Sequence, residues 1–290
     1  MTSPSAQISI SAVHPALAEA RSFLFVPGNR SERFEKAIRA GADAVILDLE
    51  DAVPVADKDS ARAAIRSQWD ALAALGLPLV VRINSEGSSA FEADVQAAAA
   101  LPGLAGVMLP KAESAATLQR LHERLPDVAL VPLIESAAGL DAVKAIAAAP
   151  GVLRLAVGHI DFMADLGFSC GEDESELLPL RFAVVLATRL ARLAPAIDGV
   201  TVQTGDEERL RSDTLRARRL GYGGKLCIHP KQPAGVHTAF APGEQEVAWA
   251  RRVVQADAQS GGAAVQLDGR MVDAPVVLQA RRTLTRADRS

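Results

Sequence analysis

Short apolar runs recur along the chain, and each is followed by a longer segment of helical length. The runs do not alternate between apolar and polar positions, which is typical of parallel strands that are covered on both faces. The longer segments, such as residues 31–40 and 181–193, are rich in Ala, Leu, Arg and Glu. The expected strands are residues 22–26, 44–48, 79–83, 106–110, 129–134, 153–157, 199–203 and 223–228.

The repeating order of strand and helix predicts an α/β fold. Eight such units fill about 210 residues, which is close to the usual size of a (β/α)₈ TIM barrel. A doubly wound sheet is the structural alternative, but the count of eight and the even spacing favour the barrel. We therefore expect a flexible N-terminal tail over residues 1–20, a catalytic barrel over residues 21–240, and a C-terminal helical extension, or lid, over residues 241–290.

The composition narrows the range of partners. The 290 residues include 31 Lys and Arg against 35 Asp and Glu, a net charge of −4, and only 4% aromatic residues. The chain therefore has no general positive field for DNA or an anionic membrane, and few rings for stacking on single-stranded bases. No apolar run reaches transmembrane length, and the first 20 residues lack the features of a secretion signal. With only two cysteines, far apart in sequence, we expect a cytoplasmic protein.

Acidic residues gather at the expected strand ends. Asp48, Glu50 and Asp51 lie within four positions at the end of the second strand, where like charges repel one another. Glu135 follows the fifth strand and Asp161 follows the sixth. Because the carboxyl ends of barrel strands meet at one rim, we expect these carboxylates to face a common centre. Either a bound cation offsets their repulsion, or they are separate loop and helix-capping residues in contact with solvent.

A hard divalent cation would explain so acidic a rim. Mg²⁺ prefers oxygen ligands and usually takes only one or two protein carboxylates, leaving its other positions to water and substrate. Glu135 and Asp161, at matching depth on adjacent strands, are therefore the expected metal ligands. Asp48, Glu50 and Asp51 are expected to hold metal-bound waters from further out.

Arg82 lies in an otherwise apolar strand. A buried Arg requires an anionic or carbonyl partner. One interpretation is a structural ion pair with a carboxylate of the second strand. The functional interpretation is that Arg82 stabilises a developing oxyanion or binds a substrate carboxylate. Both interpretations remain open from the residues alone.

Other residues at the strand ends give weaker signals. Arg30 and Lys36 lie on the first helical turns after the first strand, a weak indication of phosphate binding. His159 and His229 are candidate acid or base groups. Cys227 lies inside an apolar strand and is expected to be a buried small residue rather than a nucleophile.

Seven segments occur in a specific order: "RSFLFVPGNR", "GADAVILDLEDAV", "VRIN", "GVMLPKAES", "PLIESAAGL", "VGHIDFMADLG" and "GKLCIHPKQ". Together they resemble the HpcH/HpaI aldolase–citrate lyase β-subunit superfamily, and most closely its citrate lyase β-like branch, over residues 21–282. The resemblance implies a (β/α)₈ barrel, usually a homotrimer, that uses Mg²⁺ and a CoA-thioester substrate. Any single segment is a weak signal, and the order and spacing carry the resemblance.

The resemblance also implies roles for individual residues. Glu135 and Asp161 match the metal ligands, and Glu135 is expected to contact the substrate as well. Arg82 matches the substrate-binding arginine. The segment from Arg30 to Lys36 matches the region that meets CoA. Ile228 and His229, in the "GKLCIHPKQ" segment, are expected substrate-binding residues.

The segment "LDGRMVDAPVVLQARRTL" resembles the C-terminal part of malyl- and citramalyl-CoA lyases. In those enzymes an Asp in an "MxDxP" setting enters the active site of a neighbouring subunit, and Asp273 matches it, so we expect it to be catalytic. From its spacing alone, Asp273 is a helix N-cap with Pro275 just inside the helix. Two positions depart from the family pattern: Ser136 replaces a usual Thr, and His159 lies in an altered turn that bears on substrate choice.

The expected function is that of a Mg²⁺-dependent carbon–carbon lyase. It would cleave or form a 3-hydroxyacyl-CoA such as malyl-CoA or citramalyl-CoA, with a 2-oxoacid and an acetyl-CoA-type thioester on the other side of the reaction. Thioester hydrolysis is a variant of the same chemistry. The alternatives are a CoA-independent, metal-dependent 2-oxoacid aldolase and a citrate lyase β-like component of a larger complex.

Overall fold

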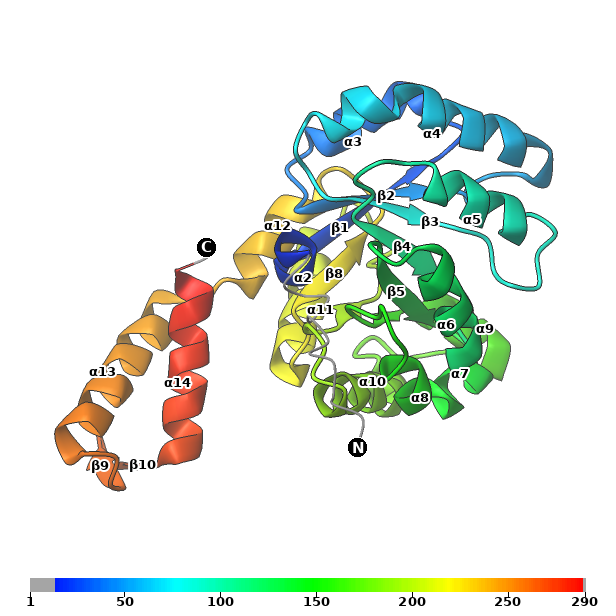
Figure 1. Cartoon of the computed structure of the whole chain (residues 1–290). Coiled ribbons are helices and arrows are strands. Elements are labelled where there is room, and N and C mark those ends of the chain that lie inside the picture. Colours follow the sequence, from blue (N-terminus) through cyan, green and yellow to red (C-terminus); the bar gives the residue numbers. More distant parts are fainter. Residues whose placement is uncertain (1–13, 289–290) are drawn as a thin grey trace, which may run out of the picture. The chain divides into compact units, whose positions relative to one another are not determined.

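The structure is a computed structural model that describes residues 14–288. Its central feature is a closed barrel of eight parallel strands in chain order, with β1 paired to β8 (Figure 1). This closure confirms the predicted TIM barrel and rules out the doubly wound sheet. The strands are β1 (Ser22–Pro27), β2 (Ala44–Asp48), β3 (Leu79–Arg82), β4 (Gly106–Leu109), β5 (Ala129–Ile134), β6 (Ala156–Val157), β7 (Ile197–Asp198) and β8 (Gly224–Cys227).

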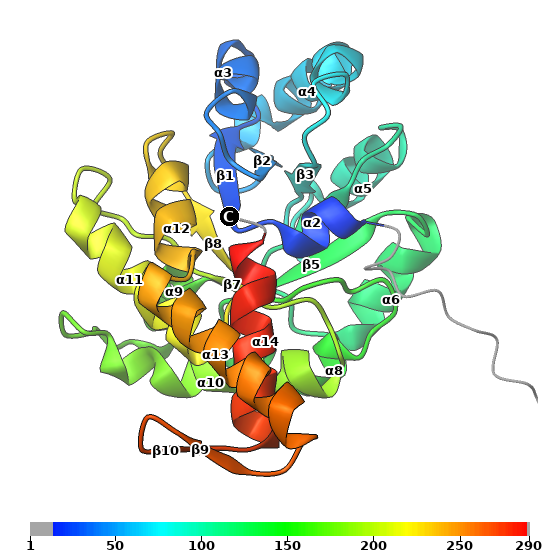
Figure 2. The ribbon, with the colours of Figure 1, turned by 90° about the vertical axis from the view of Figure 1, so that its left-hand side faces the viewer.

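Helices form a ring outside the strands (Figure 2). Helix α4 illustrates the packing, because its buried residues Ala61, Ile65, Trp69 and Leu72 recur every three or four positions and form one face. The helices of the ring are α3 (Phe34–Ile38), α4 (Lys58–Ala73), α5 (Phe91–Ala99), α6 (Ala115–Arg124), α7 (Ala137–Asp141), α8 (Val143–Ala147), α9 (His159–Leu166), α10 (Leu178–Leu190), α11 (Glu207–Leu220) and α12 (Gln232–Phe240). Short 3₁₀ turns are η1 (Ser31–Arg33), η2 (Val55–Asp57) and η3 (Ser175–Leu177).

The predicted position of the seventh strand, residues 199–203, is wrong. The strand is Ile197–Asp198, which pairs with β8 through Ile197–Gly224 and Asp198–Lys225. Its second residue, Asp198, is charged and fully buried, and it forms an ion pair with Arg181 at 3.1 Å. A charged residue in a two-residue strand has no apolar signature, whereas the apolar run after it belongs to a loop. Thr201 is buried in that loop and Val202 is half exposed.

Alternate residues of the strands fill the barrel interior, as the pleat requires. Ile46 and Val80 belong to the buried core cluster inside the barrel. Asp48 and Arg82 lie two positions further along the same strands and are direct neighbours in register. They therefore point inward one layer above the apolar core, at the carboxyl ends of the strands where barrel enzymes carry their active sites.

Part of the predicted flexible tail is folded. Residues 1–13 lie outside the described residues, but the next residues form helix α2 (Pro15–Glu19). Leu17 of this helix is 1% exposed and belongs to the barrel core. The fully buried guanidinium of Arg154 donates hydrogen bonds to the carbonyl oxygens of Leu17 and Ala20. The tail prediction is therefore wrong for this part.

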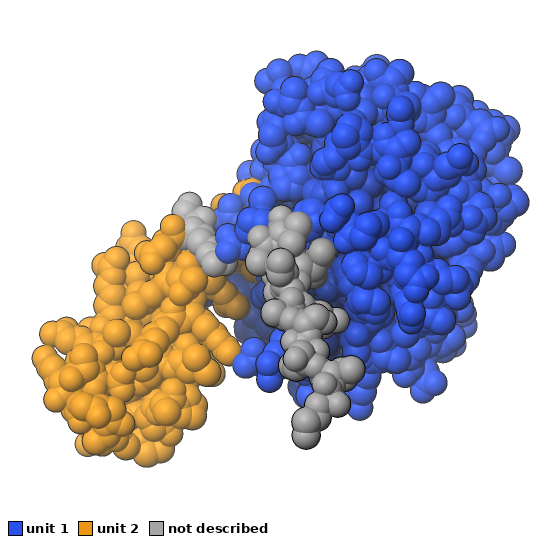
Figure 3. Space-filling view, viewed as in Figure 1, with its two compact units in different colours: residues 1–236 blue, residues 237–290 orange. Residues whose placement is uncertain are grey.

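The chain divides into two compact units, residues 1–236 and residues 237–290 (Figure 3). The division falls inside α12, close to the predicted boundary after residue 240. The second unit contains α13 (Glu244–Ser260), β9 (Val265–Leu267), β10 (Arg270–Val272) and α14 (Ala274–Ala287). Asp268 and Gly269 join the two strands with positive φ angles of 50° and 75°, the conformation that a two-residue hairpin turn favours. Among residues 14–288, no helix combines the length and apolar character needed to cross a bilayer.

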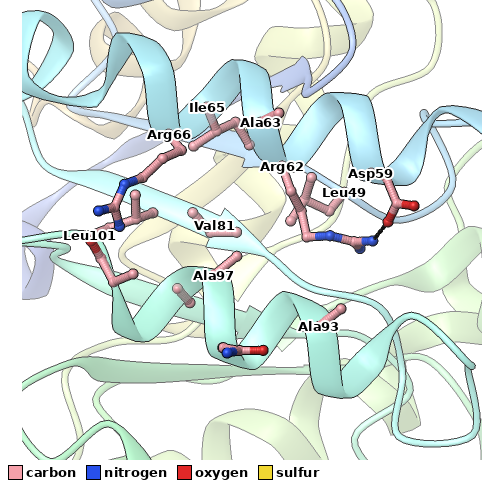
Figure 4. A pocket seen from close by; sticks show the side chains of 13 residues that line it. Leu49, Asp59, Arg62, Ala63, Ile65, Arg66, Val81, Ala93, Ala97 and Leu101 are labelled. Carbon is pink, nitrogen blue, oxygen red and sulfur yellow. Dashed lines mark hydrogen bonds and ion pairs between the residues drawn. The ribbon is translucent and has the colours of Figure 1, made fainter.

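A groove of about 420 Å³ lies between α4 and α5 on the outer layer of the first unit (Figure 4). Leu49 and Val81 are among its apolar lining residues, and Arg62 and Arg66 extend from α4 beside it. None of the predicted site residues lines this groove. The predicted metal ligands and Arg82 lie instead toward the carboxyl ends of the strands.

Candidate active site

Arg82 forms a two-pronged ion pair with Asp48. Its Nε and Nη2 each donate to a different Asp48 oxygen at 2.6 Å, and its Nη1 lies 2.9 Å from Glu50 Oε2. The guanidinium also lies over the ring of Phe25, 4.8 Å from the ring centre. Burial alone would lower the pKa of Arg82, but Asp48 and Glu50 raise it above its ordinary value, so the group stays charged. The structural ion pair with a second-strand carboxylate is thus present.

Asp48 has no acceptor capacity left. Besides Arg82, its Oδ1 accepts the amide of Glu50 at 2.9 Å and its Oδ2 accepts the amide of Ala52 at 3.3 Å. A carboxylate offers about four lone-pair positions, and all of them are used here. Asp48 is also only 1% exposed. Its oxygens fix Arg82 and the turn after β2, and the expectation that Asp48 also holds a metal-bound water stays a prediction.

Glu50 joins two cations at the same rim. Its Oε1 accepts a hydrogen bond from Lys111 Nζ at 2.8 Å, while its Oε2 faces Arg82. Burial raises the pKa of Glu50 above its ordinary value, although Arg82 and Lys111 act in the opposite direction. The neighbouring Asp51 is exposed, and its charge adds to the upward pKa shift of Glu50. Arg82 and Lys111 thus offset part of the repulsion that the "DLED" cluster implies.

Glu135 follows β5 and is 3% exposed. Its Oε1 accepts one hydrogen bond, from the backbone N–H of Lys111 at 2.8 Å. Burial raises the pKa of Glu135 to about 8, and the negative charges of Asp161 and Glu50 contribute in the same direction. A cation bound beside Glu135 would stabilise the ionised form that burial and the acidic neighbours disfavour.

Asp161 lies in the first turn of α9, which follows β6. Strands β5 and β6 are neighbours in the barrel, with Ile134 in register with Val157. Asp161 is close enough for its charge to raise the pKa of Glu135. The structure therefore brings the two predicted metal ligands to the same part of the rim. Among residues 14–288, no cluster of three or more His, Cys, Asp or Glu side chains is arranged for a metal. Mg²⁺ usually takes only one or two protein carboxylates, which is the number that Glu135 and Asp161 offer.

Gly158 precedes α9 and leaves room for Glu135. A β-carbon added at position 158 would lie 2.7 Å from the β-carbon of Glu135 and would also collide with its Oε2. Glu135 thus packs against Gly158 and accepts the Lys111 amide. Sequence reasoning did not select Gly158, because a glycine at a strand end is indistinguishable from a turn residue.

The basic residues after β1 lie at the surface. Arg30 pairs with Glu32 at 2.7 Å, and both side chains are about half exposed. Lys36 is exposed on α3. This short helix begins at Phe34 after the 3₁₀ turn, so the two cations lie on different elements. Their predicted contact with CoA remains a prediction.

The amides of Ile228 and His229 are already used within the chain. Both donate to Oε1 of Gln232, at 2.8 and 3.1 Å, and Gln232 Nε2 donates to the carbonyl of Thr201. The predicted substrate contacts of Ile228 and His229 would therefore come from their side chains, and Ile228 is 40% exposed. The role of Gln232 could not be predicted from the sequence, because its hydrogen-bond partners are determined only by the fold.

His159 is 4% exposed and packs against Gly199. Burial lowers the pKa of His159, and the charges of Asp198 and Glu174 oppose this shift. Asp198 follows Ile197, which belongs to the barrel core, so Asp198 lies on the outer side of the strand. His159 therefore faces a charged cluster behind the strands, which argues against an acid or base role at the rim.

Asp273 belongs to the second unit, at the N-cap position of α14. Its side chain makes no capping hydrogen bond, and Pro275 removes one of the amides that a cap would accept. Capping therefore does not explain the choice of an acidic residue at this position. Cys227 is buried, as expected, and burial raises the pKa of its thiol to about 12.

Comparison with known proteins identifies the family. Residues 21–230 match the family described as HpcH/HpaI aldolase/citrate lyase. The chain belongs to this family. The predicted resemblance is thereby confirmed.

Several relatives cover nearly the whole chain. It is 39% identical over 284 residues to a citrate lyase subunit beta-like protein of Deinococcus radiodurans, covering 93% of this chain and 98% of that protein. It is 32% identical to a (3S)-malyl-CoA thioesterase of Cereibacter sphaeroides, covering 92% and 94%. Its structure resembles that of CitE from Mycobacterium tuberculosis in complex with magnesium, acetoacetate and coenzyme A. That match has a TM-score of 0.82 and 36% identity, and it covers 93% of this chain and 99% of CitE.

Proposed function

We propose that this protein is a Mg²⁺-dependent carbon–carbon lyase acting on a 3-hydroxyacyl-CoA of the malyl-CoA or citramalyl-CoA type. The reaction releases a 2-oxoacid and leaves an acetyl-CoA-type thioester, or runs in the reverse direction. The observation that carries the proposal is the meeting of Glu135 and Asp161 at the carboxyl ends of adjacent strands. The CitE structure, which contains magnesium and coenzyme A, and the malyl-CoA thioesterase support the same substrate class.

Glu135 and Asp161 are the residues that would hold the metal, with Glu50 and Asp51 available for metal-bound waters. When bound, Mg²⁺ supplies Lewis acidity and orients the C3 oxygen and the adjacent carboxylate of the substrate. The raised pKa of Glu135 fits this assignment, because a dication stabilises the ionised form that burial and the neighbouring carboxylates disfavour.

Arg82 places a fixed positive charge inside the rim. Asp48 holds its guanidinium in one orientation, and the cation remains 12% exposed toward the barrel mouth. Breaking the C2–C3 bond leaves negative charge on the thioester oxygen, and a preorganised cation stabilises such charge without reorganising. We assign this role to Arg82, in addition to its structural ion pair.

Asp273 is proposed as the acid that returns a proton to the enolate carbon, or removes one in the condensation direction. Its carboxylate makes no capping hydrogen bond in α14, which is consistent with a chemical role. The protein would act as a homotrimer in which Asp273 serves a neighbouring subunit. Arg30 and Lys36 are proposed to contact the CoA phosphates.

Thioester hydrolysis is the second candidate function. It is favoured by the 32% identity with a (3S)-malyl-CoA thioesterase over nearly the whole chain. Hydrolysis requires the same binding contacts with the substrate, together with a water molecule at the thioester carbon. A citrate lyase β-like subunit would instead require a carrier-protein thioester and partner subunits.

Purified protein should be tested with malyl-, citramalyl- and methylmalyl-CoA, and with the corresponding free acids, with and without Mg²⁺. A lyase releases acetyl- or propionyl-CoA together with a 2-oxoacid, whereas a thioesterase releases free CoA and the hydroxy acid. We expect metal-dependent turnover of at least one CoA ester and none of the free acids. Turnover of free acids alone, or of no CoA ester by the purified chain, would contradict the proposal.

A further inference from the structure

Lys111 adopts a backbone conformation that its residue type disfavours. It follows Pro110 directly after β4 and has a φ angle of +47°, in the left-handed region where a β-carbon is crowded. Such strain persists when surrounding contacts hold the residue in place, and it concentrates at functional sites. The next residue is held to β5, because the amide of Ala112 donates to the carbonyl of Leu133 at 3.2 Å.

In this conformation, the two hydrogen-bond donors of Lys111 contact two different glutamates. Its backbone N–H donates to Glu135 Oε1 and its Nζ donates to Glu50 Oε1, both at 2.8 Å. Both carboxylates are at least nine-tenths buried, whereas the Lys111 side chain is 43% exposed. One residue of β4's loop thus links the end of β5 to the loop after β2.

We propose that Lys111 is a positioning residue of the metal centre. Its backbone N–H holds Glu135, and its ion pair with Glu50 holds Lys111 itself in the left-handed conformation. Glu135 also packs against the backbone of Gly158, where an added β-carbon would lie 2.7 Å from the Glu135 β-carbon. The inference rests on the proposed function, because it takes Glu135 to be a metal ligand. Lys111 acts through Glu135 and need not touch metal or substrate.

Simple electrostatics makes the opposite prediction for the removal of this ammonium group. A positive charge near a cation site repels the cation, so its loss should tighten metal binding if charge were the only effect. If the ammonium instead anchors the backbone that orients Glu135, its loss should weaken metal binding. The sign of the change in metal affinity therefore separates the two roles.

The test measures the dissociation constant of Mn²⁺, used in place of Mg²⁺, by electron paramagnetic resonance. Lys111→Met keeps the length and the strained backbone but removes the ion pair, and we expect about tenfold weaker binding, the effect typical of lost support for a metal ligand. Lys111→Arg retains a cation and should recover most of the affinity. Lys144→Met is the matched control, because Lys144 is exposed on α8, and it should bind like the parent protein.

Two results would overturn the inference in distinguishable ways. Equal or tighter Mn²⁺ binding by Lys111→Met, with the parent protein binding normally, would remove the positioning role and leave the proposed function intact. No Mn²⁺ binding by the parent protein would remove the proposed function as well. Lys111→Gly provides a second variant that accepts the positive φ without strain and lacks the ammonium, so weakened binding there supports the same role even if Lys111→Met folds poorly.

Discussion

At the scale of single residues, the site depends on how each carboxylate is partnered. Asp48 has all its acceptor positions filled, Glu50 is shared by two cations, and Glu135 accepts a single amide. The residue types and their approximate meeting place could be predicted from the sequence. Their partners could not, because hydrogen-bond saturation and a positive φ angle at Lys111 arise only from the folded backbone.

Replacing Glu135 with Gln should abolish metal binding without unfolding the protein. The amide cannot supply the anionic oxygen that Mg²⁺ requires, so we expect affinity to fall by about 100-fold or more. The metal-free variant should be at least as stable as the parent at neutral pH, because burial disfavours the ionised carboxylate. Calorimetric titration with Mg²⁺ and thermal unfolding without metal check both statements. A variant that binds Mg²⁺ normally would contradict the role of Glu135.

Metal affinity should depend on pH through the same carboxyl group. The pKa of Glu135 is raised from 4.5 to about 8 in the metal-free protein, so below pH 8 the metal must displace a proton. The apparent affinity should therefore rise by up to about tenfold per pH unit toward pH 8 and then level off.

The stability of the metal-free protein should change with pH in the opposite direction to the metal affinity. Between pH 4.5 and about 8 the native carboxyl group keeps a proton that the unfolded chain releases, so the metal-free protein should lose stability as the pH rises through this window. Denaturation with and without Mg²⁺ at several pH values measures the effect. A metal-free stability that does not fall between these pH values would contradict the raised pKa.

At the scale of elements, the neighbouring strands β2 and β3 depend on the Asp48–Arg82 pair. Arg82→Met should lower the free energy of unfolding by about 3–5 kcal/mol, because it leaves Asp48 buried without its cation and removes one of the two cations beside Glu50. Urea denaturation measures this change. Arg39→Met, just after α3, also removes an ion pair, but its partner Glu35 is exposed, so it provides the comparison on the outer layer. Unchanged stability in Arg82→Met would contradict the structural part of its role.

The boundaries of elements could be predicted from apolar runs where the strands are apolar. The predictions were wrong where the strands are not apolar. Strand β7 was misplaced because its outward residue is the buried, charged Asp198. Helix α2 was missed because five residues near a terminus carry little helical signal, although Leu17 completes the barrel core. In both cases a tertiary contact, rather than a local preference, determines the element.

Helix α2 can be tested through Leu17. Leu17→Ala should destabilise the protein by about 2–5 kcal/mol, since the side chain is 1% exposed in the core. Leu166→Ala, where the side chain is 46% exposed, is the control and should have a much smaller effect. Chemical denaturation compares the two variants. Equal effects would mean that α2 is not part of the folded barrel.

At the scale of the whole molecule, the proposed active residues are divided between the two compact units. Glu135, Asp161 and Arg82 belong to residues 1–236, and Asp273 belongs to residues 237–290. The closed barrel could be predicted from the eightfold repeat, and the separate extension from the segment that remains after the eighth strand–helix unit. The partner site of Asp273 could not, because it depends on how copies of the chain assemble.

Complementation between two inactive variants tests the proposed sharing of sites. Glu135→Gln and Asp273→Asn should each be inactive with an acyl-CoA substrate when produced alone. When they are produced together, mixed oligomers would pair an intact metal site with an intact Asp273, and a fraction of the activity should return. No recovery in mixtures whose mixed assembly is verified by native mass spectrometry would contradict the sharing of Asp273 between subunits.

The central claim is that Glu135 and Asp161 share one hard divalent cation at the mouth of the barrel. Anomalous diffraction from crystals grown with Mn²⁺ tests this claim most directly, because it locates the ion independently of activity. We predict a single strong peak within ligand distance, about 2.0–2.3 Å, of oxygens from both side chains. A structure with Mn²⁺ bound elsewhere, or with the two carboxylates turned toward different partners, would contradict the account.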